Sequence, residues 1–200
     1  MEIEPDDEGT ANVGGNARLT GSLGAAIFIL LFIEGLTIPR VRQFISWHVF
    51  VGVLLIVFVV AKIASTSYRF ARYYLGQRDY VEKGPPSLVL RALGPIVTVT
   101  TVAVLATGIG AVLAGRASHW LPLAHKASFI VWFGAMTVHV LGHALETPAL
   151  ALADWRRSRR GSVKGATARL AILAVVLTVG IPLAIASVGW SHHWQRLHGR

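Results

Sequence analysis

The sequence predicts an all-α fold: an integral membrane helix bundle of about five transmembrane helices. Hydrophobic residues make up 54% of the 200 residues, and charged residues only 14%. A soluble domain carries roughly 25% charged residues, so this composition is typical of a chain surrounded by lipid. Five apolar stretches each reach the roughly 20 residues that a helix needs to cross the hydrocarbon core of a bilayer.

The expected helices follow from the bounds of these apolar stretches and from Pro39, which closes the first one. They span about residues 19–38, 43–66, 88–113, 123–145 and 167–188. We expect four regions: a disordered acidic tail over 1–18, a four-helix membrane domain over 19–155, a basic loop with the fifth helix over 156–190, and a polar tail over 191–200.

Positive charge is concentrated in two of the short loops between these stretches. The formal net charge is +9, and Lys and Arg gather in residues 68–91 and 155–169. The positive-inside rule then predicts a multi-pass protein of the cytoplasmic membrane, with its N-terminus in the cytoplasm and its C-terminus outside. Basic loops of this kind contact anionic lipid, so nucleic acid is not an expected partner.

Four of the eight histidines lie in or at the ends of the expected spans: His48, His125, His139 and His143. Ionisable residues inside a membrane are costly and indicate a functional site. The second and fourth helices cross the membrane in the same direction, which places His48 and His125 at similar depth near the outer side. Two facing imidazoles at one depth are what a haem b with two axial histidines requires.

Helical spacing places a third histidine on the same face, deeper in the membrane. His139 follows His125 by 14 residues, which is about 40° around the helix and about 21 Å along it. Lys62 occupies the corresponding position 14 residues after His48. The sequence therefore favours one haem near the outer side. A second, inner haem would need Lys62 or a residue of another helix; Lys62 could instead reach the inner surface or contact a propionate or quinone.

The absence of cysteine excludes thiolate-bound haem, cysteine-bound iron–sulfur clusters and covalently attached c-type haem. Glycines near the histidines, Gly52 and Gly108 among them, could leave room for a porphyrin or allow close helix packing. Glu34 is expected either to reach water at the outer boundary or to serve a proton or quinone site. Arg40 and Arg42 could bind propionates or anchor the helix ends at the interface.

The sequence resembles the bacterial membrane cytochrome b group, especially the b561-like and cytochrome b/b6-like haem-binding domains. The resemblance rests on the segments WHVFVGVLLIVFVVAKIASTSYRFARYY, GPPSLVLRALGPIVTVTTVAVLATGIG and HKASFIVWFGAMTVHVLGH. It implies a four-helix haem-binding core whose ligands come from alternate helices, 14 residues apart on each. His48, His125 and His139 match these positions, and Lys62 stands at the fourth.

The resemblance implies electron transfer between a quinone or a redox partner subunit and an acceptor. If the chain is an enzyme, it is then an oxidoreductase that works as an electron-transfer subunit. Two alternatives stay open. One is a cofactor-free membrane anchor or assembly subunit, in which the histidines form hydrogen bonds between helices. The other is a small transporter or proton pathway that uses Glu34, Lys62 and His139.

Overall fold

The computed structural model describes residues 6–84, 88–143 and 166–198. All regular structure in these residues is helical, which confirms the predicted all-α class. Five of the described helices are long and apolar enough to cross a membrane, so the chain is a multi-pass protein of a lipid bilayer.

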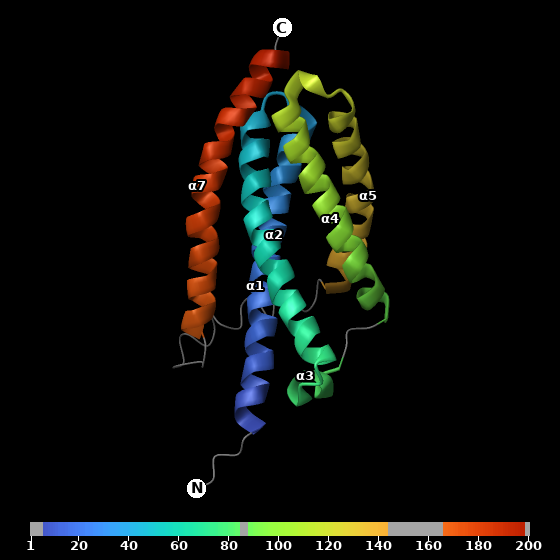
Figure 1. Cartoon of the computed structure of the whole chain (residues 1–200), viewed down its shortest axis with the longest axis vertical. Coiled ribbons are helices and arrows are strands. Elements are labelled where there is room, and N and C mark those ends of the chain that lie inside the picture. Colours follow the sequence, from blue (N-terminus) through green and yellow to red (C-terminus); the bar gives the residue numbers. More distant parts are fainter. Residues whose placement is uncertain (1–5, 85–87, 144–165, 199–200) are drawn as a thin grey trace.

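The five long helices run along one axis, and the two ends of the chain lie at opposite ends of the bundle (Figure 1). The long helices are α1 (Asp6–Thr37), α2 (Ile45–Tyr74), α4 (Leu88–Ala114), α5 (Trp120–His143) and α7 (Ala166–His198). A short α3 (Arg78–Glu82) follows α2, and two single 3₁₀ turns, Ile38–Arg40 and Gly115–Ala117, follow α1 and α4. The end expected for the fourth helix and most of the basic loop fall in residues 144–165, outside the described residues.

The first helix is longer than its apolar stretch. It begins at Asp6, inside the region expected to form a disordered tail, and it reaches Thr37. Polar contacts with α2 hold this extension. The Asn16 amide donates to the backbone and side-chain oxygens of Ser65, both at 3.2 Å, and the hydroxyls of Thr20 and Ser65 lie 2.6 Å apart. These contacts explain why a segment of low hydropathy continues the helix.

The second helix is also longer than the hydrocarbon core of a bilayer is thick. Its 30 residues correspond to about 45 Å, against about 30 Å for the hydrocarbon core. The helix stops before Gly76, whose φ of +73° is the left-handed conformation that often ends helices. Its last turns lie at the end of the bundle that carries α3 (Figure 1).

The helices pack in two groups. Helices α1, α2 and α7 share a buried apolar cluster: Leu23, Ile27, Val51, Leu54, Leu55, Phe58, Val176 and Ala184. Gly180 brings α7 close to α2, since a Cβ added there would lie 2.8 Å from Leu54 Cδ1. The second group is the α4–α5 hairpin, in which the Trp132 indole donates to Thr101 Oγ1 at 2.9 Å.

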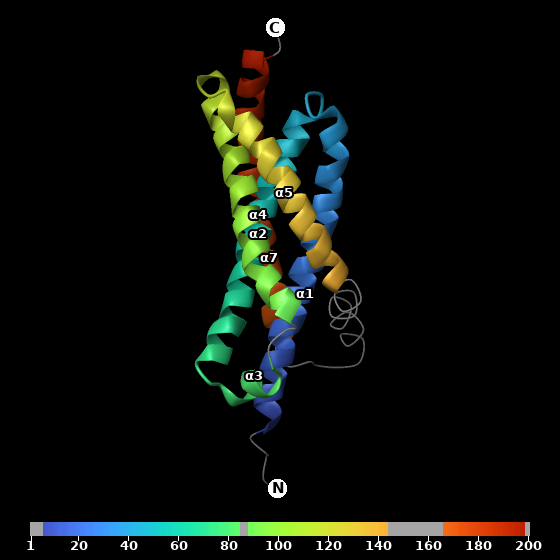
Figure 2. The same ribbon diagram turned by 90° about the vertical axis from the view of Figure 1, so that its right-hand side faces the viewer.

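These two groups lie on either side of a plane that contains the long axis. The α4–α5 hairpin stands on one side of α2 and α7 on the other, as the two views show (Figures 1 and 2). Helix α2 packs mainly on α1 and α7, and α4 mainly on α5. Side chains that reach from α2 toward α5 therefore meet between two separately packed units.

Candidate functional site

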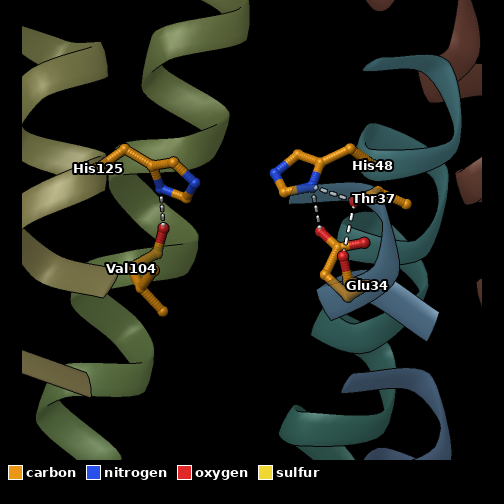
Figure 3. Close-up of polar contacts among 5 residues, drawn as sticks. All are labelled: Glu34, Thr37, His48, Val104 and His125. Carbon is orange, nitrogen blue, oxygen red and sulfur yellow. Dashed lines mark hydrogen bonds and ion pairs between the residues drawn. The ribbon is translucent and has the colours of Figure 1, made fainter. Parts of the chain in front are cut away.

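His48 lies one turn inside the start of α2 and is held by two groups of α1. Its Nδ1 is 3.0 Å from Glu34 Oε1 and 2.9 Å from Thr37 Oγ1 (Figure 3). The Thr37 hydroxyl donates its one hydrogen to the Glu34 carbonyl oxygen at 2.6 Å. Toward His48, Thr37 is therefore an acceptor. The network assigns the imidazole hydrogen to Nδ1 and leaves a lone pair on Nε2.

His125 lies near the start of α5 and is held by the backbone of α4. Its Nδ1 is 2.9 Å from the Val104 carbonyl oxygen (Figure 3). A carbonyl oxygen only accepts, so His125 also carries its hydrogen on Nδ1 and a lone pair on Nε2. The Thr107 hydroxyl lies 3.4 Å from the same nitrogen and 3.1 Å from Ser128 Oγ. Both imidazoles thus donate from Nδ1, and in the neutral form of each ring the lone pair lies on Nε2.

Gly108 makes room for the His125 ring. A Cβ added at this position would lie 2.9 Å from Cε1 and 3.1 Å from Nδ1 of His125. Real Cβ atoms essentially never approach another heavy atom as closely as 2.9 Å. The glycine therefore sets how near His125 can sit to α4, and only a residue without a side chain permits the observed ring position.

The two imidazoles face each other across the space between the helix groups. Their ring centroids lie 6.2 Å apart and their planes are nearly perpendicular, at 79°. Figure 3 shows the Nε2 side of each ring directed at the other. A bond from imidazole to a metal is about 2 Å long, and the nitrogen lies about 1.1 Å from its ring centroid. Two such bonds on opposite sides of one metal ion span about 6 Å between centroids, which agrees with the observed separation.

The donor set suits a metal that brings further ligands of its own. Among the described residues, no three His, Asp or Glu side chains converge on one point. Zinc sites use three or four protein ligands, so the pair by itself fits such a site poorly. Haem iron takes four equatorial nitrogens from the porphyrin and needs at most two axial ligands from the protein. The His48–His125 pair therefore fits a haem with two axial histidines.

Glu34 is partly buried, and it contacts the His48 ring. Its carboxyl side chain is 15% exposed, and Oε2 is buried without a hydrogen-bond partner. Gly52 leaves space for it, since a Cβ added at Gly52 would lie 3.5 Å from Glu34 Oε1. The contact between Glu34 and His48 was not predicted from the sequence. A usable signal existed, because each residue lies three positions from the helix end at the same turn.

His139, His143 and Lys62 form a second polar group, further along α2 and α5 than the His48–His125 pair, and it has fewer hydrogen bonds. His139 Nδ1 is buried without a hydrogen-bond partner, and its ring centroid lies 4.8 Å from that of His143. Lys62 is close enough for its charge to act on His139. The Lys62 ammonium group donates to the Thr20 carbonyl of α1 at 3.1 Å. His139 and Lys62 thus lie in one region, but no direct bond joins them.

Three further sequence candidates lie on the turn before α2 and in the middle of α5. Arg40 and Arg42 are exposed on the turn between α1 and α2, directly before the helix that carries His48. Gly134, on α5 between the two histidines of that helix, has open space around its Cβ position, so it makes no close approach.

Comparisons with protein families, with curated proteins and with solved structures find no match to this chain.

Proposed function

We propose that this chain is a transmembrane haem b protein that carries electrons, with Nε2 of His48 and Nε2 of His125 as the axial ligands. The observation that carries the proposal is the pair of neutral imidazoles with hydrogens on Nδ1, which face each other at 6.2 Å between ring centroids. In the absence of a group between them, two lone pairs would point into one partly buried space. A metal ion bound there would use both.

The sequence resemblance to b561-like and cytochrome b/b6-like domains supports the same function. It assigns ligands to His48 and His125 independently of the hydrogen-bond network. Bound haem would supply a one-electron couple between Fe(III) and Fe(II). A quinone or a redox partner subunit at the membrane surface would deliver or accept that electron, which makes the chain an oxidoreductase subunit.

The protein's own residues would orient the group and exclude water. The Glu34 carboxyl group and the Val104 carbonyl fix the two ring orientations, as partners of ligating histidines commonly do. Gly108 leaves space beside the His125 ring. Arg40 and Arg42, exposed on the adjacent turn, could pair with the haem propionates. By the positive-inside rule this site lies toward the outer side, with the N-terminus in the cytoplasm.

The inner group of His139 and Lys62 is the candidate for a second haem or for contact with a quinone. The unpartnered Nδ1 of His139 supports a role beyond helix packing. Lys62 would have to give up its bond to Thr20 before it could act as a ligand. The outer pair needs no such rearrangement, and we therefore assign the first haem to it.

Spectroscopy of the purified protein in detergent tests the proposal. We expect a sharp b-type α band in the dithionite-reduced minus oxidised spectrum, and about one haem per chain by pyridine haemochrome. His48→Ala and His125→Ala should each abolish the six-coordinate low-spin spectrum. His139→Ala, on the same helix as His125, is the matched control and should keep it.

A colourless protein, even after expression with added haem, would refute the proposal and favour a membrane anchor or a transporter. Loss of the spectrum in His139→Ala but not in His48→Ala would move the haem to the inner group. Two haems per chain would mean that Lys62 or another residue completes an inner site.

A further inference from the structure

The two imidazoles of the outer pair have chemically different partners. His48 Nδ1 contacts a carboxyl group, Glu34 Oε1, at 3.0 Å. His125 Nδ1 contacts a neutral backbone carbonyl, that of Val104, at 2.9 Å. A backbone carbonyl is present at every turn of a helix, whereas a carboxylate inside a membrane span is costly to place. Its position against one of the two rings therefore requires a reason.

We propose that Glu34 is a positioning residue that makes His48 the stronger electron donor of the pair and so lowers the reduction potential of the bound haem. This inference rests on the proposed function. The electron that reduces the haem enters the iron, both bonds to Nε2 remain, and no proton is required at Glu34.

The physical argument begins with the hydrogen bond. When Glu34 is ionised, its carboxylate accepts the Nδ1 hydrogen, draws it away from the ring and increases the electron density on Nε2, which raises the basicity of a ligating histidine. A more basic axial ligand stabilises Fe(III) over Fe(II), and axial ligation and hydrogen bonding around the haem set its potential. A bond to a charged acceptor is about twice as strong as one to a neutral acceptor.

The surroundings of Glu34 strengthen the effect. Its side chain is 15% exposed, and that of His48 is 20% exposed. Charges interact more strongly in such a partly buried site than in water. Oε2 has no hydrogen-bond partner, so the carboxyl group's one polar contact with a described side chain is the one with His48. Gly52 leaves the space that this arrangement needs.

The test compares two variants that alter one acceptor each. Glu34→Gln keeps the size of the side chain and an acceptor oxygen but removes the charge. Thr37→Val removes the other acceptor of the same Nδ1 hydrogen at nearly constant volume. Midpoint potentials are measured by titration with dithionite and ferricyanide at one fixed alkaline pH, at which the carboxyl group of Glu34 is ionised, on protein that carries haem.

We expect Glu34→Gln to shift the ferrous-to-ferric ratio at a given potential by at least tenfold toward the ferrous form, which is an increase of about 59 mV for one electron. Thr37→Val should shift the ratio by less than threefold, and Glu34→Asp should lie between wild type and Glu34→Gln. A Glu34→Gln ratio within threefold of wild type would overturn the inference. So would an equal shift in Thr37→Val.

A second measurement covers the case in which Glu34→Gln does not retain haem. The wild-type protein is labelled with ¹³C at the glutamate carboxyl groups, and its reduced-minus-oxidised infrared spectrum should contain a label-sensitive carboxyl band. The reason is that reduction of the iron makes the Nδ1 hydrogen of His48 less acidic and so weakens its hydrogen bond to Glu34. The labelled apoprotein is loaded with unlabelled haem, so that the propionates do not interfere. A spectrum with no label-sensitive band would overturn the inference. Colourless wild-type protein would instead refute the proposed function, so the two failures are distinguishable.

Discussion

A single methyl group on α4 should disturb the His48–His125 site, and the structure sets the size of the effect. In Gly108→Ala, the new Cβ would start 2.9 Å from Cε1 of His125. Carbon atoms pack at about 3.5–4.0 Å, so the ring or the helix must move by about 0.6 Å or more. Metal–ligand distances tolerate only about 0.2 Å. Overpacking of this kind costs about 1–3 kcal/mol, and for the haem proposed above this corresponds to an affinity about fivefold to 150-fold weaker.

Haem titration of the apoprotein in detergent, followed by absorbance, measures this affinity. Gly134→Ala is the matched control, because it adds the same methyl group to α5 where nothing lies within 4 Å of the Cβ position. Affinity of Gly108→Ala within twofold of wild type would refute the argument that His125 has no space to move. An equal loss in Gly134→Ala would show that the effect comes from general helix packing and not from the ring contact.

Two further predictions concern packing and titration away from the pair. Trp132→Phe removes the indole donor to Thr101 and should lower the free energy of unfolding by about 0.6–1.7 kcal/mol. Steric-trap unfolding measures this change. The control is Trp47→Phe, at an exposed position, which should have less effect. Burial, together with the nearby Tyr68, raises the pKa of Tyr80 above its ordinary value. The fold therefore favours the protonated phenol, and this stability is present below pH about 10 and lost as the pH rises through the raised pKa. Tyrosinate absorbance should show one late-ionising phenol that Tyr80→Phe removes; an unchanged titration curve would contradict this.

The sequence was sufficient to predict the number of membrane-spanning helices, because the length of each apolar stretch is read directly from it. It also predicted the facing of His48 and His125, since five spans place the starts of the second and fourth helices at one depth. The ring centroids at 6.2 Å agree with that expectation. The identity of the group between them stays a prediction, tested by the spectra described above.

What the sequence did not predict depends on how helices rotate and pack. The bond from Glu34 to His48 requires that the turn at Ile38–Arg40 bring two specific faces together. The continuation of α1 through its polar residues around Asn16 is accompanied by contacts with Ser65 of α2, which hydropathy does not reveal. The close approach of α7 to α2 depends on Gly180, and nothing in an apolar stretch indicates which neighbour a glycine will meet.

The division of the bundle into two packed groups has a consequence for synthesis. A ribosome delivers α1 and α2 to the membrane first, with Glu34, Thr37 and His48 already able to adopt their arrangement. Val104, Gly108 and His125 belong to the hairpin that follows. The site is thus incomplete until α5 has been inserted, and no earlier intermediate of translation can bind a group through both histidines. Helix α7 follows the hairpin in the chain and packs on the far side of α2, so binding of a group between the two histidines and the synthesis of α7 can overlap in time without competing for the same face.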